Sequence, residues 1–139
     1  MSKRSNRPAL LAAAAGIVLL VGAPAQAKDQ LTGEQKLAKL LEGRVAEKPV
    51  NCISILTADE QITVIDKTAI VYGWGEVIYV NRPTNADQLN SDDILITHPT
   101  GSENCSIDTI QLRDRTTHMY DGFVGLQQFV PYRRVKTQG

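Results

Sequence analysis

The stretch AIVYGWGEVIYV, residues 69–80, consists of two β-branched and aromatic segments on either side of Gly73-Trp74-Gly75. Such segments favour strands, and glycine adopts the positive φ angles that tight turns between antiparallel strands need. This stretch therefore predicts a β-hairpin. The indole of Trp74, the single tryptophan, either stays exposed and stacks on a sugar, a peptide or an aromatic ligand, or folds back over the core.

Similar patterns continue on both sides of this hairpin. From Val50 onward, β-branched and aromatic residues replace the leucine and alanine that precede them. Turns are indicated by the polar residues 81–93, by residues 98–102 and by Asp121-Gly122,. The predicted strands cover residues 50–56, 61–66, 68–72, 76–81, 94–97, 105–113 and 123–130. Six to seven short strands with frequent turns predict a mainly β fold, a small antiparallel barrel or sandwich.

One amphipathic helix is predicted before the strands. Thr32 is a suitable N-cap, and Gln35 stands at the third position of a capping box,. Leu37, Leu40 and Leu41 form one apolar stripe,. A helix this short is unstable alone in water, so we expect its leucines to cover one side or end of the sheet. A helix that binds a partner is the alternative.

The first 27 residues have the composition of a secretory signal peptide,. Lys3, Arg4 and Arg7 precede an apolar run at residues 9–21, and Ala25-Gln26-Ala27 offers small residues to a signal peptidase. The apolar run has 13 residues, whereas a membrane-spanning helix needs about 18. We expect cleavage after Ala27, with a membrane anchor as the alternative. The predicted organisation is a signal peptide at 1–27, a polar lead and amphipathic helix at 28–49, an antiparallel β domain at 50–134 and a flexible tail at 135–139.

The charge of the processed chain limits its partners. The sequence has 15 basic and 15 acidic residues, and three basic residues leave with the signal peptide, so 12 basic and 15 acidic residues remain and the net charge becomes −3. We expect no nucleic-acid partner, because phosphate binding needs a basic surface. No second long apolar run follows the first, so we expect no membrane span after signal removal and a periplasmic or secreted location.

Cys52 and Cys105 are the only cysteines, and both lie in the exported part. An oxidising compartment allows a disulfide between them, which would close a loop of 54 residues, both ends counted. A redox pair or a thiolate metal site is the alternative, although both usually have closer spacing. Each cysteine follows an asparagine, in Asn51-Cys52 and Asn104-Cys105. If the two strands are neighbours, the disulfide joins the early part of the sheet to its late part.

No complete catalytic or metal-binding motif is present, and we expect no catalytic residue, cofactor or metal. The only histidines, His98 and His118, lie beside predicted turns. A small hydrolase that uses one of them with a nearby carboxylate is an alternative function. Metal binding by these histidines with Asp92, Asp93 or Glu103 would need three or four converging ligands. Adjacent acids are usually solvated, so we expect the two aspartates to be exposed where a strand begins.

Arginine and aromatic residues form the remaining candidate surface. They occur in Arg113-Asp114-Arg115 and in residues 129–134, FVPYRR. Arginine and tyrosine are favoured at interaction surfaces, because both combine area with directed hydrogen bonds. Trp74, Arg113 and Tyr132 are therefore the candidate binding residues. Asp114 is expected to form a surface ion pair with its flanking arginines.

Five segments of the chain resemble parts of a known group of proteins. They are Asn51-Cys52-Ile53-Ser54, Ile65-Asp66-x-x-Ala69-Ile70-Val71-Tyr72, Tyr79-Val80-Asn81-Arg82-Pro83, Cys105-Ser106-x-Asp108-Thr109-Ile110 and Phe129-Val130-Pro131-Tyr132. The group is a family of small exported bacterial proteins of unknown function, and the resemblance covers most of residues 33–134. It implies an exported bacterial protein whose two cysteines form a pair, and it carries over no catalytic residue.

The sequence thus favours an exported domain, not an enzyme, that binds through one face of its sheet. Its partner would be a protein, an envelope component or a small ligand. The alternatives are the small hydrolase described above and a purely structural envelope protein.

Overall fold

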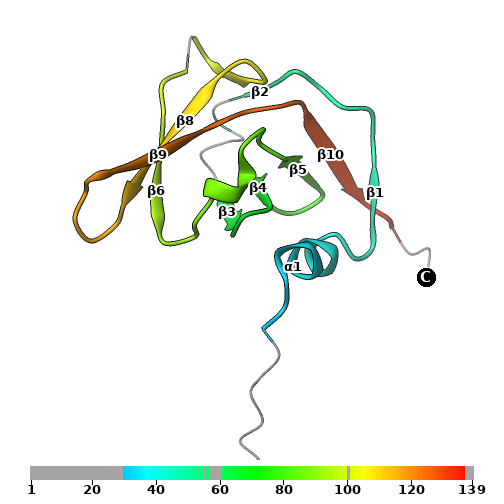
Figure 1. Cartoon of the computed structure of the whole chain (residues 1–139). Coiled ribbons are helices and arrows are strands. Elements are labelled where there is room, and N and C mark those ends of the chain that lie inside the picture. Colours follow the sequence, from blue (N-terminus) through cyan, green and yellow to red (C-terminus); the bar gives the residue numbers. More distant parts are fainter. Residues whose placement is uncertain (1–29, 55, 57–60, 100, 137–139) are drawn as a thin grey trace, which may run out of the picture.

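The computed structural model describes residues 30–54, 56, 61–99 and 101–136 (Figure 1). The predicted signal peptide and the last three residues of the predicted tail lie outside these ranges. Within them the chain forms one α-helix, one short 3₁₀ helix and ten β-strands. A mainly β fold with one N-terminal helix is therefore confirmed.

The elements are short and follow one another closely along the chain. In order they are α1 (Gly33–Leu40), β1 (Arg44–Ala46), β2 (Cys52–Ser54), β3 (Ile62–Ile65), β4 (Ala69–Tyr72), β5 (Val77–Asn81), η1 (Ala86–Gln88), β6 (Asp93–Thr97), β7 (Glu103–Cys105), β8 (Thr109–Asp114), β9 (Tyr120–Gly125) and β10 (Phe129–Arg134).

Local signals explain the start of α1. The side chain of Thr32 accepts a hydrogen bond from the backbone N–H of Gln35 at 3.2 Å, and the Gln35 side chain accepts one from the N–H of Thr32 at 2.9 Å. This is the predicted capping box, which satisfies two N–H groups at the helix start. Leu37 is the buried residue of the helix, only 1% exposed. The leucine stripe therefore covers the sheet, as expected.

Three antiparallel sheets form an open sandwich. The five-stranded sheet has the order β1-β10-β5-β4-β3, the three-stranded sheet has the order β6-β8-β9, and β2 pairs with β7. Strands β4 and β5 form the predicted hairpin, and its two turn glycines, Gly73 and Gly75, have φ angles of 84° and 83°. No strand pairing joins the two larger sheets among the described residues. The fold is therefore sandwich-like, and the barrel is not closed.

Ten strands take the place of the predicted six to seven because two predicted strands are divided. Residues 105–113 hold the end of β7 and most of β8, separated by a turn in which Asp108 donates its N–H to the carbonyl of Cys105 at 3.0 Å. Residues 123–130 likewise hold parts of β9 and β10. Strand β1 was not predicted, because its three residues show no apolar alternation. It forms by pairing with β10, where Val45 lies opposite Arg133.

Two apolar cores lie on the two faces of the five-stranded sheet. The main core, against β8 and β9, contains Tyr72 and Phe129, whose rings meet edge to face with centroids 5.6 Å apart. The second core, which we call the helix-side core, packs Leu37 against Val71, Ile78, Val80 and neighbouring residues of the same sheet face. All four residues of β4 are buried. Burial on both faces explains why this strand is continuously apolar rather than alternating.

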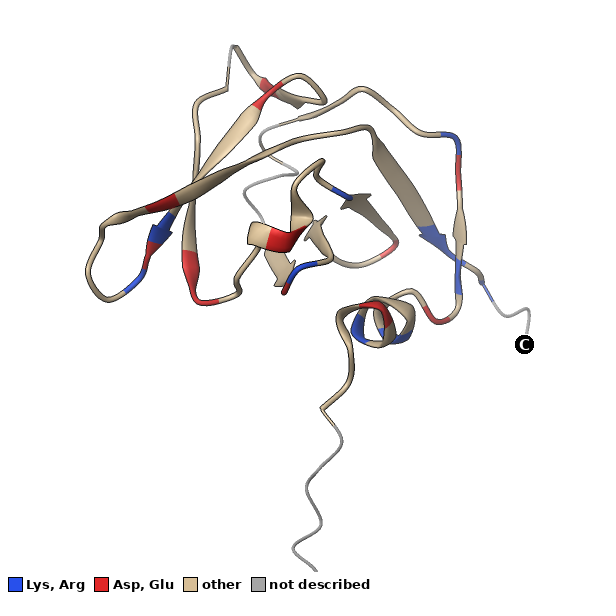
Figure 2. Ribbon diagram, in the orientation of Figure 1, with Lys and Arg blue, Asp and Glu red and all other residues tan. Residues whose placement is uncertain are grey.

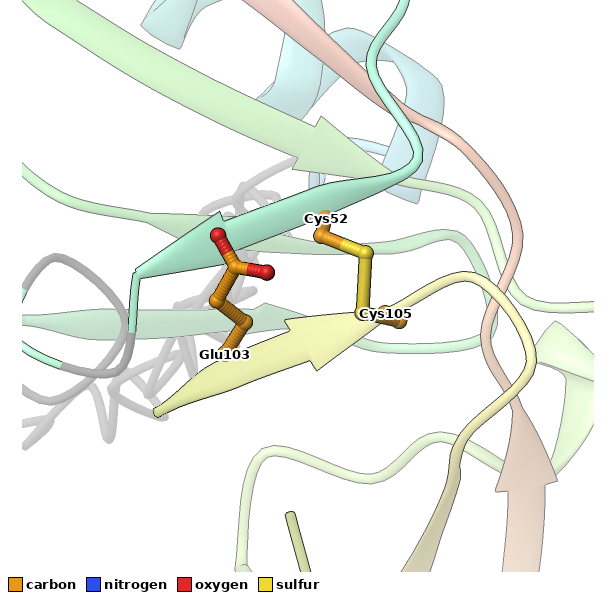
Figure 3. Close-up of side chains that lie close together, drawn as sticks. All are labelled: Cys52, Glu103 and Cys105. Carbon is orange, nitrogen blue, oxygen red and sulfur yellow. A yellow bond between two sulfur atoms is a disulfide. The ribbon is translucent and has the colours of Figure 1, made fainter. Parts of the chain in front are cut away.

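The predicted disulfide is confirmed. Cys52 of β2 lies directly opposite Cys105 of β7, and their sulfur atoms are bonded (Figure 3). The bond therefore joins two strands that are 53 positions apart in the sequence. Among the described residues, no helix has the length and apolar character needed to cross a membrane.

Candidate functional site

A pocket of about 450 Å³ lies beside α1 over strands β5 and β10. Val130 is paired with Val80 across these strands, and Tyr132 follows two residues later on the same face,. Val80 and Tyr132 also contact the helix-side core. We call this hollow the α1 pocket. Its lining residues are Pro49, Val80, Arg82, Ser106, Leu126, Gln127, Gln128, Val130 and Tyr132.

The α1 pocket combines an apolar floor with a polar rim. Val80, Val130 and the ring of Tyr132 supply apolar area from two paired strands, whereas Arg82, Gln127 and other polar residues supply hydrogen-bonding groups. Small-molecule sites typically have this composition, in which apolar contact gives affinity and a few polar groups fix orientation. The arrangement can therefore bind an apolar group that carries a polar end.

Asn81 holds one wall of the pocket in place. It is fully buried, and its side-chain amide donates to the carbonyl of Gln127 at 2.5 Å while its side-chain oxygen accepts from the N–H of Gln127 at 3.2 Å. These two bonds fix the loop between β9 and β10 against the end of β5. This role of Asn81 was not predictable from the sequence, because the residue stands where a polar loop begins and the local pattern does not reveal a partner 46 positions away.

Arg82 links the pocket to α1. Its two terminal nitrogens donate to the two carboxylate oxygens of Glu34 at 2.6 and 2.9 Å. Hydrogen bonding to Arg82 lowers the pKa of the Glu34 carboxyl, and the same bonds, with a smaller contribution from the nearby Tyr132, raise the pKa of the Arg82 guanidinium. The charged forms of both side chains are therefore favoured at neutral pH. Elsewhere, charged residues of both signs are interspersed along the chain (Figure 2).

The three predicted binding residues do not form one surface. Tyr132 lines the α1 pocket. Trp74 lies 67% exposed in the β4–β5 turn, so its indole does not fold back over the core, and it borders another hollow with Leu40 and Arg44. Arg113 belongs to the three-stranded sheet, where its guanidinium donates to the carbonyl of His118 at 3.3 Å. Two of the three residues therefore border hollows beside α1, and the third lies on a different sheet.

Asp114 does not form the predicted ion pair. Its carboxylate accepts hydrogen bonds from the backbone N–H groups of Thr116 and Thr117 at 2.9 and 2.6 Å, and from the Thr117 hydroxyl at 2.9 Å. These bonds lower the pKa of the carboxyl. No ion pair between Asp114 and Arg113 or Arg115 occurs in the described part of the chain. The prediction was wrong because the turn after β8 offers this side chain N–H donors at closer range.

The two histidines lie at opposite ends of the three-stranded sheet. His98 follows the end of β6, whereas His118 lies in the β8–β9 turn with a φ of 58°. His98 shares a hollow of about 390 Å³ with Asp108, but the carboxylate of Asp108 accepts the backbone N–H of Cys105 at 2.7 Å. Across the described residues, no hydrogen bond joins either imidazole to a carboxylate.

Only one group of described residues brings three potential metal ligands within 4.8 Å of one another: Cys52, Glu103 and Cys105 (Figure 3). The two sulfur atoms are bonded to each other, so neither is available as a thiolate ligand. His98 and His118 are not part of any such group in these ranges. The disulfide interpretation of the cysteines therefore replaces the metal-site alternative.

Asp93 is buried, contrary to expectation. It begins β6, as predicted, but it is only 3% exposed, and neither carboxylate oxygen has a hydrogen-bond partner among the described residues. Burial raises the pKa of this carboxyl, and Asp121, Asp114 and Asp92 raise it further. The sequence could not show this, because the burial depends on pairing with β8, which places Asp114 directly opposite.

We expect Asp93→Asn to stabilise the protein at pH 7 by about 1–3 kcal/mol, because the uncharged amide removes a buried, unpaired negative charge that lies near other aspartates,. A raised pKa means that the folded state keeps a proton that the unfolded chain has already lost. The free energy of unfolding should therefore fall as pH rises from the unfolded value near 3.8 through the folded pKa,. Urea unfolding between pH 4 and 8 measures both effects, and the variant should lack this part of the pH dependence.

The matched control for this prediction is Asp92→Asn, because Asp92 is the exposed neighbour. It should change stability by no more than about 0.5 kcal/mol. A loss of stability in Asp93→Asn at pH 7 would show that the buried carboxylate is compensated by interactions that its surroundings do not reveal.

Comparison with known proteins identifies no relative: no protein-family model, curated protein or solved structure matches the chain. Two hollows of the described residues contain a predicted binding residue: the α1 pocket contains Tyr132, and a hollow of about 360 Å³ beside the β4–β5 turn contains Trp74. The α1 pocket, at about 450 Å³, is the larger of these two and has both an apolar floor and a charged rim. We therefore take it as the candidate functional site.

Proposed function

We propose that this chain is an exported binding domain of the cell envelope, not an enzyme, and that the α1 pocket is its binding site. The observation that carries the proposal is the pocket itself, in which Val80, Val130 and Tyr132 form an apolar floor below polar residues. Burial of an apolar group on this floor would supply affinity, and the polar groups would supply orientation. The ligand is a small molecule or a side chain of a protein partner.

Two further features support the proposal. The signal-peptide composition of residues 1–27 and the Cys52–Cys105 disulfide suit a periplasmic or secreted protein,. Five of the nine lining residues come from segments that resemble the small exported bacterial proteins of unknown function, and we propose that the chain is related to them. Those five are Val80, Arg82, Ser106, Val130 and Tyr132.

Native mass spectrometry of the protein recovered from its own compartment tests this function. We expect a chain that starts at Lys28, has a mass two hydrogens below the reduced value and carries retained mass from a bound ligand. Val130→Trp places a large side chain in the pocket, so at equal ligand concentration the ligand-bound fraction should fall as expected for an affinity loss of about tenfold or more, equivalent to about 1.4 kcal/mol.

The matched control is Val135→Trp, because Val135 is exposed and does not line the pocket. This variant should keep the retained mass. Equal binding by both tryptophan variants would remove the α1 pocket from the proposal. A chain without retained mass whose hydrolase activity is lost on substitution of His98 or His118 would favour the hydrolase alternative. A chain without retained mass, hydrolase activity or partner would favour the purely structural alternative.

A further inference from the structure

We infer that the α1 pocket binds molecules that carry a carboxylate on an apolar body. In the ligand-free protein the carboxylate of Glu34 occupies the position on Arg82 that the carboxylate of the ligand takes when it binds. This inference rests on the function proposed above, because it names the ligand class of the same pocket. Its structural basis is the juxtaposition of the Glu34–Arg82 pair with the apolar floor of Val80 and Val130.

Arg82 already binds a carboxylate in the geometry that a ligand would use. Both oxygens of Glu34 accept hydrogen bonds from the two terminal nitrogens of Arg82, at 2.6 and 2.9 Å. The planar guanidinium group is suited to this two-point contact, which a single-point cation such as lysine does not provide. Glu34 lies 48 positions before Arg82, so the fold itself presents the guanidinium to a carboxylate from another element.

The pair is weak enough to be exchanged. The side chains of Arg82 and Glu34 are 52% and 66% exposed, and ion pairs with such exposure contribute little stability. Displacing Glu34 should therefore cost a ligand no more than about fivefold in affinity. An apolar body that covers the pocket floor would recover this loss, because burial of apolar area is favourable.

Helix α1 can lose the contact with Arg82 and stay in place. Its start is held by the capping box between Thr32 and Gln35, and its packing depends on Leu37, which is 1% exposed in the helix-side core. Glu34 takes part in neither interaction. Exchange of its carboxylate for that of a ligand therefore requires only a rotation of one exposed side chain.

The chemistry of the pocket orients the ligand. Arg82 follows Val80 at one side of the Val80–Val130 pair, and Tyr132, which is paired with Ile78, lies at the other side. Arg82 is therefore the charged end of the pocket, and the two valines and the ring of Tyr132 extend away from it along β5 and β10. We therefore place the carboxylate at Arg82 and the apolar body over the two valines. A fatty acid and an apolar peptide with a free C-terminus share this chemistry.

Isothermal titration of the oxidised, full mature chain with matched probes tests the inference. The probes are decanoate and 1-decanol, and an apolar hexapeptide as its free acid and as its C-terminal amide. We expect one carboxylate probe to bind more tightly than its neutral counterpart, by up to about fivefold. Glu34→Gln should tighten binding of that carboxylate further, again by up to about fivefold. Arg82→Gln should abolish the preference for the carboxylate, and binding of the neutral counterpart should change in neither variant.

The matched control is Glu47→Gln, which removes the carboxylate from a comparable exposed pair with Arg133 and should leave all affinities unchanged. A preference for decanoate identifies a fatty acid as the source, and a preference for the free-acid peptide identifies a chain terminus. Equal binding of charged and neutral probes, unchanged in Arg82→Gln, overturns the inference and leaves the proposed function intact. Failure of all four probes to bind overturns the inference, whereas the proposed function fails only if the retained mass is also absent.

Discussion

Replacing Cys52 and Cys105 together by alanine is expected to lower the free energy of unfolding by about 4 kcal/mol, the value that the chain-entropy model gives for a loop of this length. The bond joins positions 53 apart in the sequence, so its loss frees a large part of the unfolded chain. The folded state also depends on it, because β2 and β7 form a separate two-stranded sheet with three paired positions. Ile53 of β2 is buried in the main core, so separation of these strands also exposes apolar area.

Urea unfolding followed by far-ultraviolet circular dichroism measures this loss. The wild-type chain treated with dithiothreitol should unfold at a urea concentration close to that of the double variant. The double variant itself should not respond to dithiothreitol, which provides the control. If the double variant were within about 1 kcal/mol of the oxidised protein, the disulfide would contribute far less than loop closure predicts.

Phe129→Ala is expected to cost about 3–5 kcal/mol, the range for removal of a buried aromatic side chain. Phe129 is fully buried in the main core, where its ring meets that of Tyr72 edge to face with centroids 5.6 Å apart. Such aromatic pairs add stability beyond the area that they bury. The residue also begins β10, where its N–H and carbonyl both bond to Val50 at 2.9 Å. A cavity at this position therefore lies at the start of an interior strand of the five-stranded sheet.

The matched control is Phe123→Ala, because Phe123 lies in β9 and is 49% exposed. The same deletion there should cost less than about 1 kcal/mol, since surface positions contribute little. Equilibrium urea unfolding of both variants provides the comparison. Similar losses at the two positions would contradict the placement of the core between the two larger sheets.

Much of the fold was predictable because its signals are local. The hairpin at residues 69–80 follows from strand-forming residues around Gly73 and Gly75, and the start of α1 follows from Thr32 and Gln35, three positions apart. Such patterns act through neighbouring backbone groups and need no distant partner. The cysteine pairing was predictable for a different reason, because two cysteines allow only one intramolecular bond.

The candidate site was only partly predictable. Tyr132 was selected by residue type, and the structure places it in the α1 pocket. Arg82 was assigned only to a loop, because its partner Glu34 lies on a helix 48 positions earlier. Asp93 was expected to be solvated and is buried, since pairing of β6 with β8 covers it. Each of these environments is created by residues far apart in the chain.

The sequence alone was therefore sufficient to predict the mainly β class, the hairpin, the capped helix and the disulfide. Tertiary structure decided the three-sheet arrangement, the position of α1 over the five-stranded sheet and the pocket beside α1 on β5 and β10. The physical reason is the range of the interactions. Turn, capping and strand preferences act over a few residues. The α1 pocket, in contrast, exists only after β5 pairs with β10 and Asn81 fixes the loop between β9 and β10.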